Sequence, residues 1–208
     1  MRVVVAEFER VLADTAATRA EAWRAACRAA GVGLPSDDLL ALAVRDTTEE
    51  AAARLATALA PDDGGLSALL ALAAERDATS RFARGVQLRA GAAAFVTACA
   101  SEGRVGIVSR ASRVIVATAL ALAGLEEVVA FVWSADDRAR DGAAAVSRAL
   151  GTAPRGARLA VLGDRADWLA AAAGAGARRI AVPDAPPEVT PDATWDSFQG
   201  RVPRDLDG

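Results

Sequence analysis

Short apolar segments alternate with helical patterns along most of the chain, and this alternation restricts the possible folds more than any other feature. The segments are rich in Val, Leu and Ile and apolar on both faces, which is typical of buried parallel strands. In chain order they are Arg2–Ala6, Arg104–Ser109, Val128–Ser134, Arg158–Asp164 and Arg178–Pro183. Because helical segments separate them, the pattern predicts an α/β fold with a doubly wound parallel sheet.

The region between the first two of these segments, residues 15–85, has no strand pattern. Its apolar residues recur with helical spacing, and four helical segments are expected there. The third of them begins with a Thr-x-x-Glu capping sequence, Thr47 to Glu50. We therefore predict a core domain formed by residues 1–14 and 86–208, with a helical domain of residues 15–85 inserted into it.

The composition argues against several classes of protein. The chain has 208 residues, of which 53% are hydrophobic, so it can bury a sizeable core. It has no uninterrupted apolar run of the length that crosses a bilayer, and its N-terminus lacks the pattern of a secretory signal. We expect a cytoplasmic protein without a membrane partner. A net charge of −3 argues against nucleic-acid binding.

The types of ionisable residue narrow the chemistry further. All 24 basic residues are Arg, and the chain has no His. Without Lys or His there is no amine nucleophile, no imidazole base and no imidazole metal ligand. The two cysteines, Cys27 and Cys99, lie in Ala-rich helical patterns, and we expect buried free thiols in preference to a disulfide.

Polar residues follow three of the predicted strands at the point where each strand ends. Glu7 and Glu9 follow the first, Ser109 and Arg110 the second, and Asp164 the fourth. Ligands of open parallel sheets bind at the carboxyl ends of the strands, so these side chains are expected to converge on one site. Glu7 and Glu9 also have a simpler alternative as solvated acids at a strand end, and Ser109 as a helix N-cap.

On these residues the chain resembles the haloacid dehalogenase (HAD) superfamily, in the branch of β-phosphoglucomutase and phosphoglycolate phosphatase. EFERVLADT, Glu7–Thr15, stands in place of the first family motif, Asp-x-Asp-Gly-(Thr/Val)-Leu-x-Asp-(Ser/Thr). The strand ending at Ser109 is similar to the second motif, and GDRADWLAAAAGAG, which contains Asp164, to the fourth. The resemblance covers nearly the whole chain. It implies a Rossmann-like core, a four-helix cap and Mg²⁺-dependent phosphoryl transfer on a small phosphorylated metabolite.

The first motif departs from the family at its reactive positions. Glu7 replaces the nucleophilic Asp, Glu9 the Asp that acts as general acid and base, and Arg10 the glycine. An extra methylene moves a carboxylate by about 1 Å, and a displacement of that size can cost on the order of 10²-fold in rate. The third-motif lysine is absent. Arg138 and Arg140 lie near its position, and either provides a guanidinium fork in its place.

The resemblance also assigns roles to the residues of the site. Glu7 and Glu9 take the catalytic positions, and the same two side chains with Asp164 take the positions that bind Mg²⁺. The candidates for binding phosphate are Ser109, Arg110, Arg10 and Arg138. As an alternative to the metal, Arg10 can lie between Glu7 and Asp164 as an internal ion pair.

Three functions follow from this pattern. The first is a HAD-like protein with lost or weak phosphatase activity that binds a phosphorylated metabolite or a protein partner. The second is an active Mg²⁺-dependent phosphatase or phosphomutase with Glu7 as its nucleophile. The third is a site with other chemistry, in which the pair of acids donates protons.

Overall fold

The structure, a computed structural model, describes residues 1–137, 142–183 and 188–207. The chain divides into two compact units. Met1–Asp14 and Gln87–Gly208 form one of them, which we call the core unit, and Thr15–Val86 forms the other, which we call the helical unit.

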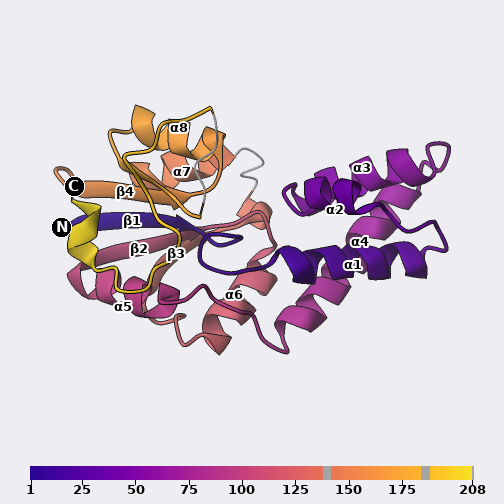
Figure 1. The fold of residues 1–208 in the computed structure, drawn as a ribbon, viewed down its shortest axis with the longest axis horizontal. Coiled ribbons are helices and arrows are strands. Elements are labelled where there is room, and N and C mark those ends of the chain that lie inside the picture. The colour runs from indigo at the N-terminus through magenta and orange to yellow at the C-terminus, as the bar shows by residue number, and fades with distance from the viewer. Residues whose placement is uncertain (138–141, 184–187, 208) are drawn as a thin grey trace. The chain divides into compact units, whose positions relative to one another are not determined.

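The core unit is built on one parallel sheet with β1 (Arg2–Glu7) at its centre. Across the described ranges the sheet has six strands in the order β3-β2-β1-β4-β5-β6. Figure 1 shows β3, β2, β1 and β4 of this sheet. The other strands are β2 (Gly103–Val108), β3 (Val129–Trp133), β4 (Arg158–Gly163), β5 (Arg178–Ala181) and β6 (Ala193–Thr194). All neighbouring pairs are parallel, so the predicted doubly wound parallel sheet is confirmed. The strand order reverses beside β1, which is where such sheets bind ligands.

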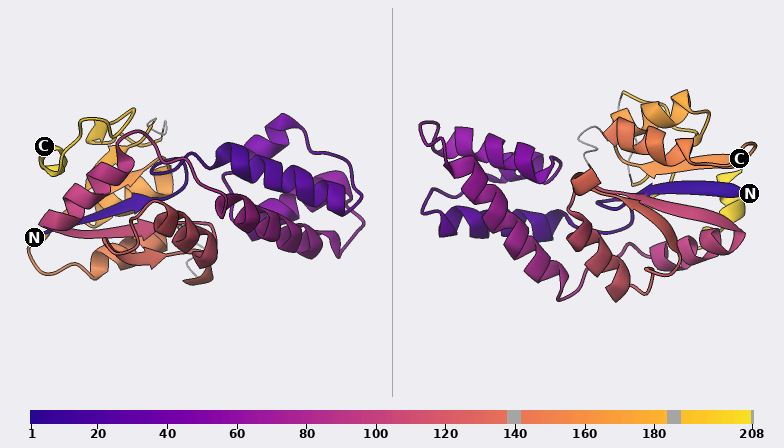
Figure 2. Two further views of the ribbon diagram at one scale, coloured as in Figure 1. Left: turned by 90° about the horizontal axis from the view of Figure 1, so that it is seen from below. Right: turned by 180° about the vertical axis from the view of Figure 1, so that it is seen from behind.

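Helices cover both faces of this sheet (Figure 2). On one face lie α5 (Ala92–Glu102) and α6 (Arg113–Leu122), and on the other α7 (Gly142–Gly151) and α8 (Ala166–Gly174). Under α7 and α8 the sheet and the helices share one apolar cluster, whose buried members include Val5, Val108, Val146, Val161 and Trp168. Burial by helices on both faces explains why the central strands are apolar at nearly every position.

The segment after β5 has no helix or strand pattern in the sequence, yet it is not all loop. It contains the two-residue strand β6 and a 3₁₀ helix, η2 (Pro203–Leu206). Between them, Trp195 and Phe198 are buried and pack on Phe95 of α5, with ring centroids 5.4 Å and 5.3 Å from that of Phe95. A strand of two residues is too short to have a periodicity, so no sequence pattern could indicate it.

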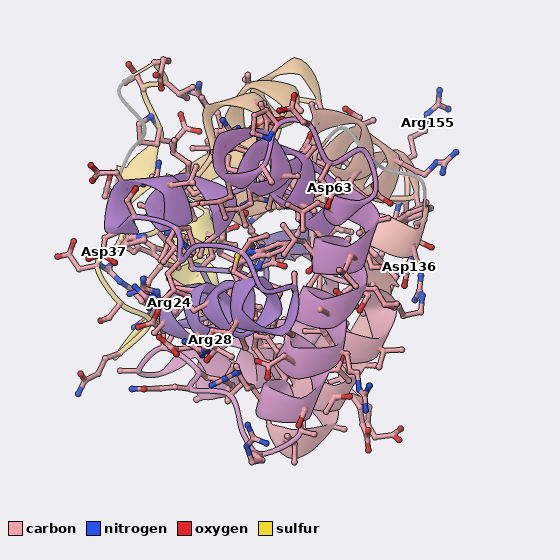
Figure 3. All side chains as sticks on the ribbon, turned by 90° about the vertical axis from the view of Figure 1, so that its right-hand side faces the viewer. Arg24, Arg28, Asp37, Asp63, Asp136 and Arg155 are labelled. Atoms are coloured by element: carbon pink, nitrogen blue, oxygen red, sulfur yellow. The ribbon has the colours of Figure 1, made fainter. Side chains whose placement is uncertain are left out.

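The helical unit contains the four helices expected from the periodicity. They are α1 (Ala16–Ala29), α2 (Asp37–Ala43), α3 (Thr48–Leu59) and α4 (Leu66–Phe82). The predicted capping box at the start of α3 is present, since the Thr47 side chain accepts a hydrogen bond from Glu50 N–H. At the surface of the unit, Arg24 joins α1 to α2 through Asp37, 2.7 Å away (Figure 3).

Two expectations from composition concern the cysteines and membranes. Cys27 and Cys99 are both buried and free, as predicted. Burial raises the pKa of Cys99 to about 12, so this thiol remains protonated at neutral pH. Among the helices of the described residues, none is both long and apolar enough to cross a bilayer.

Gly106 of β2 marks a point where the sheet has no room for a side chain. A Cβ atom there would lie 2.0 Å from Cζ of Phe131 on β3. We expect Gly106→Ala to lower the free energy of unfolding by about 2 kcal/mol, because the ring must leave its place in the packing. The control is Gly151→Ala, whose Cβ meets no atom within 4 Å and which we expect to be neutral or slightly stabilising. Equal urea midpoints for the two variants would contradict this prediction.

Candidate functional site

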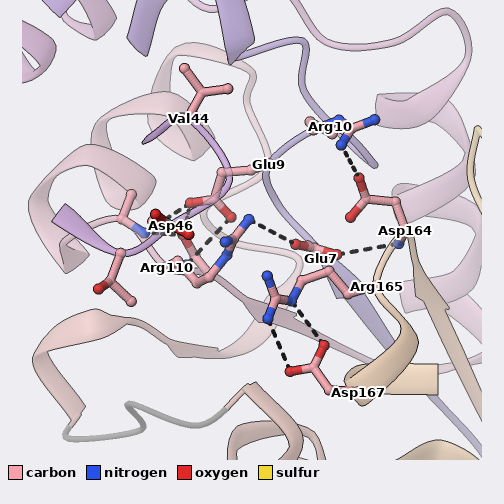
Figure 4. Close-up of polar contacts among 12 residues, drawn as sticks. Glu7, Glu9, Arg10, Val44, Asp46, Arg110, Asp164, Arg165 and Asp167 are labelled. Atoms are coloured by element: carbon pink, nitrogen blue, oxygen red, sulfur yellow. Dashed lines mark hydrogen bonds and ion pairs between the residues drawn. The ribbon is translucent and has the colours of Figure 1, made fainter. Parts of the chain in front are cut away.

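The polar residues at the strand ends lie together at the carboxyl edge of the central strands (Figure 4). Glu7 is the last residue of β1 and pairs in register with Val108, so Ser109 follows at the neighbouring strand tip. Asp164 follows directly after β4, and its N–H donates to Glu7 Oε2 at 3.3 Å. The structure therefore brings the tips of β1, β2 and β4 into one cluster.

Burial and capping decide against the simpler alternatives. Glu7 is 0% exposed and Glu9 is 1% exposed, so neither is a solvated acid. The N-cap of α6 is Ser112, whose side chain accepts from the N–H of Ile115, and Ser109 does not cap this helix. These side chains are therefore buried, and Ser109 and Glu9 contact each other.

The loop after β1 closes a tight turn around Arg10. Ala13 N–H donates to Phe8 O at 3.0 Å, and Arg10 N–H donates to Ala13 O at 2.8 Å. Arg10 has a φ of 62°, and in the part of the chain that the structure describes no other residue except glycine has a positive φ. This conformation costs a residue with a Cβ about 1–2 kcal/mol, which explains why a glycine suits the position. The contacts of the Arg10 side chain must offset that cost.

The Arg10 side chain forms an ion pair with Asp164. Its Nη1 lies 2.9 Å from Asp164 Oδ2, and the Asp164 side chain is only 4% exposed. A guanidinium group thus neutralises one of the carboxylates that the resemblance assigns to a metal. The sequence alternative placed Arg10 between Glu7 and Asp164, and the ion pair in the structure is the one with Asp164.

The Glu9 carboxylate is bound at the tip of β2. Ser109 Oγ donates to Glu9 Oε1 at 2.6 Å, Ala111 N–H donates to the same oxygen at 2.8 Å, and Arg110 N–H donates to Oε2 at 3.4 Å. We call these three donors the anion cradle, because such a set of N–H and O–H groups binds negative charge. Sequence reasoning did not include Ala111, since its donor is a backbone N–H that every residue but proline has.

Glu7 has little compensation for its charge. Its Oε1 has no hydrogen-bond donor among the described residues, and its ion-pair partner, Arg110 Nη2, is 3.9 Å away. Burial raises the pKa of Glu7 well above its ordinary value of 4.5, the Asp164 carboxylate raises it further, and Arg110 opposes these effects. A raised pKa makes a carboxyl group easier to protonate, and protonation weakens it both as a nucleophile and as a metal ligand.

Arg110 is buried, at 7% exposed, yet it keeps unused donors. Within the described ranges its Nε and Nη1 have no hydrogen-bond partner. This is unusual, because buried polar groups are nearly always paired. The neighbouring Arg165 is engaged with Asp167, with 3.0 Å between Nε and Oδ1. Arg110 is therefore a buried arginine of the described site with donors left for an anion.

The residues of the site do not fit Mg²⁺. This ion requires a near-octahedral shell of oxygen ligands, and in the described part of the chain no three Asp, Glu or Cys side chains gather in a way that could hold a metal. Of the three predicted metal carboxylates, that of Glu9 is bound to Ser109 and that of Asp164 to Arg10. Glu7 Oε1 and Asp164 Oδ1 have no hydrogen-bond partner there, but the guanidinium groups beside them already supply positive charge.

The third-motif region is described in part. Arg138, a predicted phosphate-binding residue, lies outside the described residues. Asp137, directly before it, ends the 3₁₀ helix η1 (Ala135–Asp137), and its carboxylate accepts from Ser134 N–H and from Arg113, both at 2.7 Å. Asp137 therefore fixes the turn after β3 to the start of α6 and is not free to act on a ligand.

A parallel sheet with acids at the tips of its central strands, interrupted by a helical unit after the first strand, is the fold of the HAD-like hydrolases. Solved structures of this class match the chain over nearly its whole length, so the predicted resemblance is confirmed for the fold. No family model matches the chain, and no curated protein does either.

Four solved structures, two of them of the same protein, illustrate the match. CbbY from Rhodobacter sphaeroides in complex with phosphate has a TM-score of 0.84 and 21% identity over 100% of both chains. A CbbY variant in complex with xylulose-(1,5)-bisphosphate has a TM-score of 0.82 and 21% identity over 99% of both chains. A haloacid dehalogenase-like family hydrolase from Streptococcus pneumoniae has a TM-score of 0.77 and 14% identity over 96% of this chain and 95% of that chain. A β-phosphoglucomutase from Pyrococcus sp. strain ST 04 has a TM-score of 0.70 and 20% identity over 99% of this chain and 97% of that chain. At these identities the shared property is the fold.

Proposed function

We propose that this protein binds a small phosphorylated metabolite at the tips of β1 and β2 and does not hydrolyse it. The observation that carries the proposal is the anion cradle, whose donors Ser109 Oγ and Ala111 N–H lie 2.6 Å and 2.8 Å from a carboxylate oxygen of Glu9. Donors that bind one anionic oxygen in this way also suit a phosphoryl oxygen. The CbbY complexes with phosphate and with a sugar bisphosphate support a phosphorylated ligand.

Arg110 supplies the positive charge for this ligand. Among the predicted phosphate-binding arginines in the described ranges, Arg10 is engaged with Asp164, whereas Arg110 has two buried nitrogens without a hydrogen-bond partner. A guanidinium fork binds two oxygens of one phosphate at once. Arg110 also follows Ser109 directly, so the fork and the cradle belong to the same strand tip.

The same geometry opposes phosphoryl transfer. A nucleophile in this reaction must be ionised and aligned with the phosphorus atom. Glu7 is one methylene longer than the family's Asp, and its raised pKa favours the protonated form. Glu9, at the acid–base position, is held by Ser109. Because the site does not fit Mg²⁺ either, each part of the family's chemistry is impaired.

Two measurements test the proposed function. In the first, the protein is incubated with p-nitrophenyl phosphate and with several sugar phosphates, with and without Mg²⁺, and we expect no release of phosphate above the buffer rate. In the second, the backbone N–H signals of Arg110 and Ala111 are followed by NMR while the same compounds are added. We expect saturable changes in these signals, because both donors belong to the anion cradle.

A matched pair of variants identifies the site. Arg110→Lys is expected to weaken binding roughly tenfold, since lysine keeps the charge but loses the planar fork. Arg155→Lys, at an exposed position, is expected to change nothing. Mg²⁺-dependent turnover that Glu7→Gln abolishes would overturn the proposal in favour of an active phosphatase. The absence of saturable signal changes would overturn the binding role, and the protein partner stays a prediction.

A further inference from the structure

Resting on that proposed function, we infer that Glu9 is an internal competitor of the ligand. Its carboxylate occupies the anion cradle in the free protein and must leave before a phosphoryl group can enter. The site is then autoinhibited by one of its own side chains, and a ligand binds only as far as it displaces that side chain.

The cradle holds one anion at a time. Ser109 Oγ and Ala111 N–H both donate to Glu9 Oε1, at 2.6 Å and 2.8 Å, and Arg110 N–H donates to Oε2 at 3.4 Å. A ligand oxygen that used these donors would have to take the position of the Glu9 carboxylate. Glu9 is 1% exposed, so it is enclosed in that position and is not resting at the edge of the site.

The length of the side chain and the fixed backbone beneath it make this contact possible. The family motif has Asp at this position, and glutamate reaches one methylene farther. The main chain on both sides of Glu9 is held by the turn, in which Ala13 N–H donates to Phe8 O at 3.0 Å and Arg10 N–H to Ala13 O at 2.8 Å. Because this main chain is held, we expect the cradle to be released by rotation of the Glu9 side chain.

Competition with a carboxylate selects the class of ligand. A metabolite with only a carboxylate offers the cradle what Glu9 already offers, and Glu9 has the advantage of being tethered. A phosphate monoester has a charge of about −1.5 to −2 and three acceptor oxygens. It can use the cradle and the unpartnered Nε and Nη1 of Arg110 together. The expected ligands are thus phosphate monoesters, in preference to carboxylic acids of similar size.

The size of the competition can be measured by removing Glu9. The apparent dissociation constant of a ligand is its intrinsic value divided by the fraction of protein with an open site. Charge-assisted hydrogen bonds such as those to Glu9 keep that fraction small, so we expect Glu9→Ala to tighten the binding of inorganic phosphate by about tenfold to a hundredfold. Calorimetric titration with inorganic phosphate, at constant ionic strength, gives the ratio directly.

Three control variants distinguish the effect of emptying the cradle from the effect of removing a negative charge. Glu7→Gln removes an acid from the same cluster and leaves Glu9 in the cradle, so its gain is expected to be far smaller. Glu126→Ala removes an exposed acid of the core unit and is expected to have no effect. Adding Ser109→Ala to Glu9→Ala is expected to abolish most of the gain, because the cradle then lacks its hydroxyl donor. Should Glu9→Ala fail to fold, Glu9→Gln, which keeps the shape without the charge, is expected to show an intermediate gain.

The outcomes distinguish this inference from the proposed function. If wild type binds phosphate and Glu9→Ala binds it no more tightly, the inference is wrong and the binding function stands. An equal gain in Glu7→Gln would also overturn it, since the effect would then be general electrostatics. Binding by Glu9→Ala alone supports the internal competitor and removes the binding function of the wild type. If no variant binds phosphate, both ideas fail.

Discussion

Arg110→Met is expected to lower the free energy of unfolding of the core unit by about 3 kcal/mol at pH 8, the lower end of the cost of breaking a buried ion pair. The three carboxylates of the cluster, those of Glu7, Glu9 and Asp164, lie near the guanidinium groups of Arg10, Arg110 and Arg165. Arg10 pairs with Asp164 at 2.9 Å, and Arg110 is the cation near Glu7, at 3.9 Å. Without Arg110 the buried cluster keeps its three acids and loses the guanidinium group that forms the ion pair with Glu7. Urea unfolding measures the loss, and hydrogen exchange of the β1 amides assigns it to the core unit.

The loss should be smaller at pH 5 than at pH 8. Arg110 stabilises the ionised form of Glu7, and the raised pKa of Glu7 means that this form is less populated in acid. The control is Arg155→Met, which removes an exposed arginine and should leave the free energy of unfolding unchanged at pH 5 and at pH 8. A loss at pH 8 no larger than that of the control would contradict the prediction.

The convergence of Glu7, Ser109 and Asp164 could be predicted because it depends on topology alone. Once β1, β2 and β4 are recognised as neighbouring parallel strands, their carboxyl ends must meet at one edge, whatever the side chains are. The strands themselves could be recognised because helices on both faces require continuous apolar runs. The fold therefore followed from features repeated over many residues.

The partner of each acid could not be predicted in the same way. A glutamate at position 9 is compatible with a metal, a solvent-exposed strand end or the N–H groups of the next strand tip, and the choice depends on shifts of an ångström or so. The left-handed conformation of Arg10, φ 62°, had no signal either, because the residue is one that usually avoids it. The donor at Ala111 belongs to the backbone and has no side-chain identity.

The departures from the family motif compensate for one another in the structure. Arg10 places a cation on Asp164, where the resemblance expects Mg²⁺, and Glu9 places an anion on Ser109, where it expects phosphate. Each change alone would leave a buried group unpaired, which is costly. Together they give a site in which the Arg10 guanidinium is the cation on Asp164 and the Glu9 carboxylate is the anion on Ser109. Glu7 is the member without a close partner, since its ion-pair partner Arg110 is 3.9 Å away.

Glu7→Gln is expected to raise the free energy of unfolding by about 2 kcal/mol at pH 8 and to change it little at pH 5. The amide side chain of this variant would keep the shape and the acceptor oxygen but bring no charge into a cluster with an excess of acids. Because folded Glu7 binds its proton more tightly than the unfolded chain does, wild-type stability should fall as the pH rises from 4.5 through the pKa of the folded protein. The variant lacks this fall, so the two stability curves should separate with increasing pH.

The window from pH 5 to 8 isolates Glu7 from the other shifted groups. The pKa values of Asp137, Asp192 and Asp207 are lowered from 3.8 by hydrogen bonds and arginine neighbours, so their stabilising effect is complete above pH 5. The pKa of Cys99, about 12, lies above the window. Glu126→Gln, at an exposed position, controls for net charge. Parallel curves for wild type and Glu7→Gln would mean that Glu7 is ionised throughout. The pKa of Glu7 would then not be raised by burial. Protonation of Glu7 could no longer explain why it is a poor nucleophile.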